Sequence, residues 1–225
     1  MLDIAPATYR RPVDFDGVIV CEGPGWSVAG IIDGFGSWGY GVEAASWLAE
    51  RLLPAWRSRA SLGAADIADS VSAVASQLPR EWQDDQMGCS FSVALVSNVA
   101  GSTHVVAAGL YGIAMIDGGE IHDLFRARLW INEQVRLGLL SADVARTHPL
   151  RHVVTGPFVA DGSGRPLEVL GPVGVSAQTR LLIADDRLLR AVIAMPADSR
   201  PQTAIGIQEI GRSIRAVGTP VVLAW

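Results

Sequence analysis

Lysine is absent from this sequence, and all 18 basic residues among its 225 residues are arginines. This absence excludes chemistry that depends on a lysine side chain, namely P-loop and kinase-type phosphate binding and Schiff-base catalysis. Charge is scarce as well, since only 18% of the residues are charged and the formal net charge is −5. The sequence contains no basic run, so it does not indicate a nucleic-acid-binding protein.

Cysteine and long hydrophobic runs are also scarce. Cys21 and Cys89 lie far apart and form no CxxC motif, which favours reduced thiols but leaves one disulfide open. The longest apolar stretch, Val105 to Ile116, is shorter than the ~18 residues that a membrane-spanning helix needs. The first residues lack the basic end and apolar run of a signal peptide. We therefore expect a cytoplasmic protein without a membrane partner.

Apolar residues, in contrast, are plentiful: they make up 49% of the chain, and the mean hydropathy is +0.29. A chain of this length can bury a sizeable core without disulfides or metals. We expect residues 1–225 to form a single domain. The apolar surplus also leaves homodimerisation open.

Hydrophobic periodicity divides the chain into two groups of strands, each accompanied by helices. Strands are predicted at Gly17–Cys21, Trp26–Ile32, Ser90–Ser97, Thr103–Ala108, Tyr111–Ile116, Ile121–Phe125, Arg165–Leu170, Arg180–Ala184 and Pro220–Trp225. Helices are predicted at 42–56, Ala64–Trp82, Trp130–Leu140, Ser141–Thr147, Arg187–Met195 and Thr203–Val217, with Ser141 as an N-cap. The predicted fold is an α+β, four-layer αββα sandwich, in which helices flank two largely antiparallel sheets.

A glycine cluster follows the second predicted strand, and Gly34, Gly36 and Gly39 spell the GxGxxG pattern of dinucleotide-binding proteins. Asp33 directly precedes it, where a carboxylate would repel a pyrophosphate. The next helix leads to another helix and not to a parallel strand, which also disfavours a dinucleotide. Asp33 and the carbonyl of Gly34 can instead approach a divalent cation, which prefers oxygen ligands. A plain tight turn with an aspartate cap remains an alternative.

Six motifs follow one another in a fixed order: WSVAGIIDGFGS from Trp26, GVEAAS from Gly41, GCSFSVAL from Gly88, DGGEIHDL from Asp117, HPLRHVVT from His148 and LLIADDRL from Leu181. Together they resemble the metal-dependent protein phosphatases of the PPM (type 2C) family, especially bacterial members, over nearly the whole chain. The resemblance implies two Mn²⁺ or Mg²⁺ ions that activate a bridging water for attack on phosphoserine or phosphothreonine.

The resemblance also assigns roles to single residues. Arg11 matches the phosphate-binding arginine of the family. Asp33 and the carbonyl of Gly34 match the bridging metal ligands, and Asp186 matches a ligand of the second metal. Asp16 and Asp185 are nearby acids that could support or replace these ligands, as could Glu209.

Several acidic positions of the family are missing here. Leu110 stands at the aspartate of the GDSR motif, and Phe15 stands at a glutamate. Ala127 stands at the aspartate beside the family's flap, the variable segment that here corresponds to residues 130–155. No aspartate follows Asp198. Two dications held close together need several carboxylates to offset their repulsion. We therefore expect a single weak metal site or none, and favour a catalytically impaired pseudophosphatase that acts as a regulatory or binding module in signalling. The alternative is an active, divergent metal-dependent protein serine/threonine phosphatase.

Three further residues suit the binding of a protein partner. Trp38 and Tyr40 bring aromatic side chains to the glycine loop, and exposed aromatics are frequent at interfaces. Arg187 stands where the family has a glycine, and its long cationic side chain could hold an anion. The expected partner is a protein, with a phosphoprotein or a kinase as candidates.

Overall fold

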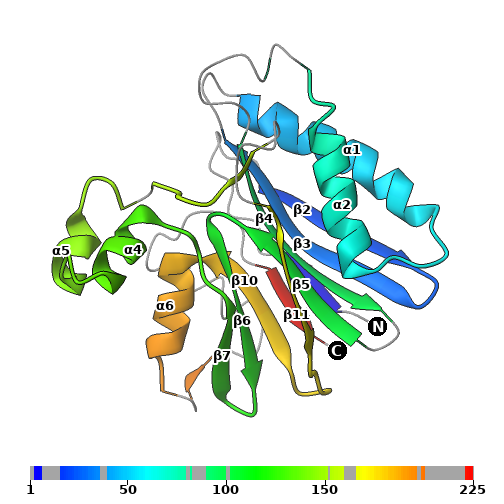
Figure 1. Cartoon of the computed structure of the whole chain (residues 1–225). Helices are drawn as coiled ribbons and strands as arrows, with labels where there is room; N and C mark the ends of the chain where they lie inside the picture. The colour runs from blue at the N-terminus through cyan, green and yellow to red at the C-terminus, as the bar shows by residue number, and fades with distance from the viewer. Residues whose placement is uncertain are drawn as a thin grey trace.

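The structure is a computed structural model that describes residues 3–6, 16–35, 40–79, 82, 90–99, 102–151, 153–159, 166–196, 199–200 and 221–224. Two sheets face each other in the middle of the molecule, and helices lie on their outer faces (Figure 1). Every strand pair of the described residues is antiparallel. The predicted αββα sandwich is confirmed.

The first sheet has the strand order β2-β3-β4-β5-β9, and the short β8 (Phe158–Val159) pairs with β4. Its strands are β2 (Asp16–Gly23), β3 (Trp26–Phe35), β4 (Ser90–Val99), β5 (Ser102–Ala108) and β9 (Glu168–Val173). The second sheet has the order β1-β11-β10-β6-β7. Its strands are β1 (Asp3–Pro6), β11 (Val221–Ala224), β10 (Arg180–Asp185), β6 (Tyr111–Asp117) and β7 (Glu120–Phe125).

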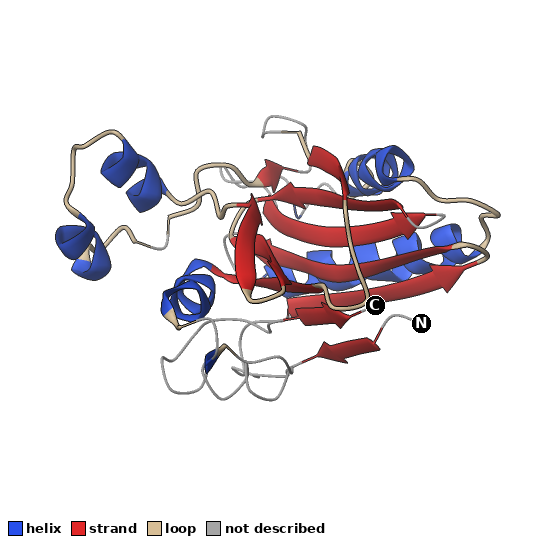
Figure 2. Ribbon diagram, turned by 90° about the horizontal axis from the view of Figure 1, so that it is seen from below, coloured by secondary structure: helices blue, strands red, loops and turns tan. Residues whose placement is uncertain are grey.

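Helices cover the outer faces of both sheets. The helices α1 (Tyr40–Arg57) and α2 (Ala64–Ala75) pack on the first sheet, and α6 (Asp186–Ala194) packs on β10 and β6 of the second. The short helices α4 (Trp130–Arg136) and α5 (Ala142–Thr147) belong to the segment from Leu129 to Thr155, which we call the flap. Both stand off to one side of the sheets (Figures 1 and 2). None of the described helices is both long and apolar enough to cross a lipid bilayer.

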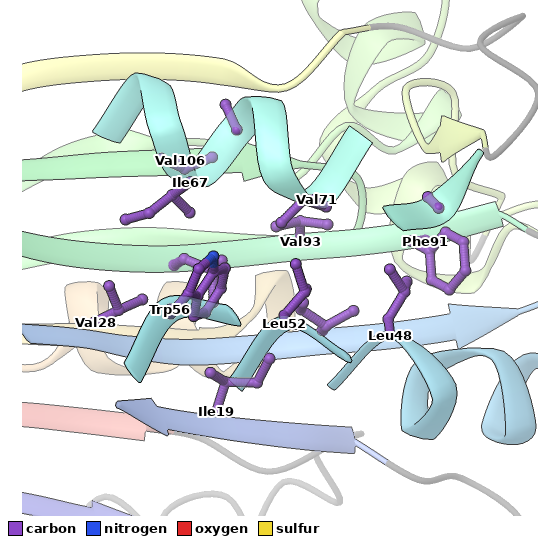
Figure 3. Close-up of a cluster of buried hydrophobic side chains, with 14 of the residues drawn as sticks. Ile19, Val28, Leu48, Leu52, Trp56, Ile67, Val71, Phe91, Val93 and Val106 are labelled. Atoms are coloured by element: carbon purple, nitrogen blue, oxygen red, sulfur yellow. The ribbon is translucent and has the colours of Figure 1, made fainter. Parts of the chain in front are cut away.

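Three layers of apolar side chains hold the sandwich together. Alternation along β3 sends Val28 and Ile32 toward α1 and α2, and Ala29 and Ile31 toward the second sheet. The layer under α1 and α2 is shown in Figure 3 and includes the fully buried Trp56. The third layer lies between the second sheet and α6. Each layer corresponds to one interface of the four-layer architecture.

Several local predictions are also confirmed. The two strands predicted at Tyr111–Ile116 and Ile121–Phe125 are β6 and β7, and Gly118 and Gly119, with φ values of 56° and 88°, form the turn between them. The hydroxyl of Ser141 accepts a hydrogen bond from the Val144 N–H at 3.3 Å and caps α5. Cys21 is a free, buried thiol. Cys89 lies outside the described residues.

Some predicted boundaries were wrong. The helix predicted to reach Trp82 ends at Ala75, because the next N–H groups, of Gln77 and Leu78, donate to carbonyls only three residues back, those of Val74 and Ala75. In contrast, α1 (Tyr40–Arg57) agrees with the predicted 42–56 to within two residues and continues through Pro54, although a proline interrupts helical hydrogen bonding. β9 continues to Val173, since its pairing with β5 extends to Thr103. The helix predicted at 203–217 lies outside the described residues.

Candidate functional site

Asp33 lies near the end of β3, on the face that carries Ala29 and Ile31 toward the second sheet. Its carboxylate is partly buried, and Oδ2 accepts a long hydrogen bond of 3.5 Å from the hydroxyl of Tyr111. The β2–β3 register places Asp16 directly opposite Asp33. The structure therefore brings the predicted bridging aspartate against a tyrosine of the other sheet.

Sequence reasoning did not select Tyr111 as a site residue. Its ring is buried at 1% exposure at the start of β6. A buried tyrosine usually needs a hydrogen-bond partner for its hydroxyl. That rule could have identified Tyr111 as a side chain that requires a polar neighbour, although not as the neighbour of Asp33.

Gly34 lies where β3 meets the start of α1. A Cβ atom built on Gly34 would lie 2.0 Å from the carbonyl oxygen of Gly41, in the first turn of α1. No side chain fits this gap, so the packing of α1 against β3 requires a glycine here. This packing requirement accounts for the glycine at position 34 without a metal ion. The role of the Gly34 carbonyl as a metal ligand stays a prediction.

Asp185 ends β10 and starts α6. Its carboxylate accepts a hydrogen bond of 2.9 Å from the Leu188 N–H, which makes Asp185 the N-cap of α6. Asp185 is only 7% exposed. The β10–β6 register places Asp185 opposite Tyr111, so Tyr111 links the end of β10 to Asp33.

Asp186 takes part in a closed ring of hydrogen bonds that we call the Asp186–Arg190–Asn132 ring. Its Oδ1 accepts from Asn132 Nδ2 at 3.3 Å, and its Oδ2 accepts from Arg190 Nε at 2.7 Å. Arg190 Nη2 closes the ring by donating to Asn132 Oδ1 at 2.9 Å. Both oxygens of the predicted second-metal ligand therefore have partners within the protein.

The ring includes two residues that sequence reasoning missed. Arg190 follows Asp186 by one helical turn, and an acid and a base at this spacing commonly pair on a helix. That spacing was a usable signal. Asn132 lies on α4, 54 residues away from Asp186, and no local pattern could have predicted its part in the ring.

The other predicted site residues are only partly placed. Arg11 and Trp38 lie outside the described residues, as does Glu209. Asp16 begins β2 and Tyr40 begins α1, but the structure does not describe their side chains. Arg187 is exposed on α6 and makes an interaction within the protein. Its role toward a partner stays a prediction.

The described residues do not fit a pair of metal ions. No three His, Cys, Asp or Glu side chains among them gather closely enough to hold one. The Arg190 guanidinium lies 2.7 Å from the Asp186 carboxylate, and a dication at that carboxylate would meet its positive charge. No metal-dependent step can be derived from this set of side chains.

Solved structures share this fold from end to end. A serine/threonine phosphatase of S. agalactiae has a TM-score of 0.73 and 18% identity, covering 100% of this chain and 99% of its own. The PPM Ser-Thr phosphatase MsPP of Mycobacterium smegmatis has a TM-score of 0.67 and 20% identity, covering 99% and 96%. The catalytic domain of the phosphatase PstP, solved with two manganese ions, has a TM-score of 0.68 and 16% identity, covering 99% and 97%.

This chain has the PPM phosphatase fold. At these identities the likeness establishes the PPM architecture and leaves the activity to be argued from the site. The sequence itself matches no protein-family model and no curated protein.

Proposed function

We propose that this chain is a divergent, catalytically impaired member of the PPM phosphatase family and acts as a regulatory or binding module. The observation that carries the proposal is the ion pair between Arg190 and Asp186, with 2.7 Å between Nε and Oδ2. In a PPM active site, the aspartate at this position would hold a metal ion. Here an arginine of the same helix already balances its charge.

Two positions that are acidic in the family have become part of the apolar core. Leu110, at the position of the GDSR aspartate, is partly buried and packs against two apolar clusters. Ala127, at the position of the flap-side aspartate, is 6% exposed and packs with Leu129 and Ile131. A carboxylate placed among these side chains would be costly to bury. The replacements therefore support a loss of metal ligands that the surrounding packing has accommodated.

A binding role is supported by the flap. Of the described large hydrophobic residues that are exposed, most lie between 137 and 153, and Leu137 and Leu139 are 54% and 67% exposed. Helix α5 contributes no buried residue. Exposed apolar side chains on a projecting element are typical of protein-binding surfaces. The proposed partner is a protein, such as a phosphoprotein or a kinase, in the cytoplasm, and Trp38, Tyr40 and Arg187 are its proposed contacts.

A phosphatase assay tests the loss of activity. The purified protein with Mn²⁺ should hydrolyse neither p-nitrophenyl phosphate nor a phosphothreonine peptide above the rate of buffer alone. The S. agalactiae phosphatase serves as the positive control in the same buffer. Hydrolysis that requires Mn²⁺ and is abolished in Asp33→Ala would overturn the proposal and establish the alternative, an active divergent phosphatase.

A further inference from the structure

We propose that Arg190 is a built-in cation that takes the place of a divalent metal at Asp186, and that its ring with Asn132 fastens the flap to the sandwich. The inference rests on the proposed function in one respect, namely that the site no longer uses a metal pair. It adds the residue that replaces the metal charge and a second, structural use for that residue.

The first argument is the saturation of the Asp186 carboxylate. Oδ1 accepts from Asn132 and Oδ2 from Arg190, at 3.3 Å and 2.7 Å. The carboxylate side chain is only 25% exposed. A metal ion would have to displace one of these donors and would also face the guanidinium charge. Arg190 therefore both neutralises Asp186 and opposes a second cation.

The second argument is that the fold fixes the position of Arg190. The Asp185 cap determines where α6 begins, so Asp186 lies in its first turn and Arg190 lies one turn later on the same face. The guanidinium is then held from two directions, with Nε on Asp186 and Nη2 on Asn132. It is positioned by the helix and by the flap together.

The third argument concerns the flap. Asn132 belongs to α4, whereas Asp186 and Arg190 belong to α6, so the ring joins the flap to the helix that covers the second sheet. Arg128, which directly precedes the flap, pairs with Glu168 of β9 in the first sheet. These two polar links hold the flap to both halves of the sandwich. A metal that captured Asp186 would break the link to α6.

The test measures Mn²⁺ binding, which does not require activity. The free Mn²⁺ signal in electron paramagnetic resonance is titrated with wild type, Arg190→Gln and Arg136→Gln. We expect Arg190→Gln to bind Mn²⁺ about tenfold more tightly than wild type, because a positive charge beside Asp186 is removed. Arg136→Gln is the matched control: Arg136 lies on α4 and pairs with Glu133 at 3.9 Å rather than with Asp186, so the Mn²⁺ affinity of this variant should equal that of wild type.

A second set of variants assigns the gain to Asp186. Adding Asp186→Asn to Arg190→Gln should abolish the gain in Mn²⁺ affinity. Arg190→Lys keeps the positive charge and should bind Mn²⁺ as wild type does. The Arg190 side chain is 63% exposed, so these variants should fold, and circular dichroism verifies this. A second neutral variant, Arg190→Ala, repeats the test independently.

Hydrogen exchange tests the fastening of the flap. Asn132→Ala should speed amide exchange in α4 several-fold and leave α1 unchanged, because only the flap loses its link. Unchanged exchange in α4 overturns the fastening role. An Arg190→Gln affinity equal to that of wild type overturns the cation role, whatever the phosphatase assay shows. Tight, Asp33-dependent Mn²⁺ binding and hydrolysis by wild type would instead overturn the proposed function.

Discussion

A single tyrosine connects the two sheets at the end of the molecule that carries the candidate residues. Tyr111 belongs to the second sheet, yet its hydroxyl donates to Asp33 of the first sheet at 3.5 Å. Its backbone pairs with Asp185, which caps α6. Burial of the aromatic ring stabilises this arrangement, while the hydroxyl supplies the acid with a donor. Asp33 is therefore held by the protein itself.

Gly34 adjoins Asp33 and gives the residue-scale prediction. We expect Gly34→Ala to lower the free energy of unfolding by at least about 2 kcal/mol, because its Cβ would lie 2.0 Å from the Gly41 carbonyl oxygen and backbone would have to move. Urea unfolding followed by circular dichroism measures the change. Gly174→Ala is the control, since nothing lies within 4 Å of a Cβ there, and it should change stability by less than about 0.5 kcal/mol. Equal effects of the two substitutions would contradict this account.

At the scale of elements, one hydrogen bond joins the two helices that cover the first sheet. The indole N–H of Trp56 on α1 donates to the Ser70 hydroxyl on α2 at 2.8 Å, and the Trp56 ring is fully buried. Ser70→Ala would leave this donor without a partner. We expect a loss of about 1–3 kcal/mol in the free energy of unfolding.

The control for Ser70→Ala lies on the same helix. Ser72 donates only to the Ala68 carbonyl, one turn earlier on α2, so Ser72→Ala removes a hydroxyl without isolating a buried donor. It should cost less than about 0.5 kcal/mol. Urea unfolding compares both variants with wild type. A Ser70→Ala protein as stable as Ser72→Ala would show that the link between the helices is unimportant.

The elements also differ in how well local sequence predicts them. Alternating burial, as in β3, and the Ser141 cap are local signals, so most strands and the start of α5 were predicted within a few residues, although β1 was not predicted. The end of α2 at Ala75 depends on the turn that follows it. The short β8 exists because Phe158 and Val159 pair with β4, from which they are distant in sequence. Local periodicity carries no information about such pairing.

At the scale of the whole molecule, the candidate site also combines features that local sequence predicts with features that depend on distant residues. The positions of Asp33 and Asp186 could be predicted because each lies in a motif of the chain. Two of their partners could not, since Tyr111 is 78 residues from Asp33 and Asn132 is 54 from Asp186. The i,i+4 spacing of Arg190 was a local signal for the ion pair at Asp186, whereas the contribution of Asn132 became visible only in the folded chain. The charge balance at Asp186, more than the missing acids, supports the proposed loss of metal binding.

The three core layers should unfold as one cooperative unit, and Cys21 offers a probe of this. Cys21 is 2% exposed in the layer between β2 and α1. Burial raises the pKa of its thiol, against the opposing influence of Arg57, so the reactive thiolate is scarce at neutral pH. In a Cys89→Ser background, labelling by a disulfide reagent should be far slower than for a free thiol. Labelling of Cys21 should reach the rate of a free thiol only when urea unfolds the chain.

The decisive comparison is between the urea midpoint of Cys21 labelling and that of the far-ultraviolet circular dichroism. Coincident midpoints are expected, because α1 and β2 are covered by the same apolar layer that holds α2 and the first sheet. A protein that carries both Cys21→Ser and Cys89→Ser has no thiol and gives the background signal of the labelling reagent. Labelling at lower urea than the loss of helix would mean that α1 separates from β2 while the rest stays folded, and the molecule would then unfold in parts.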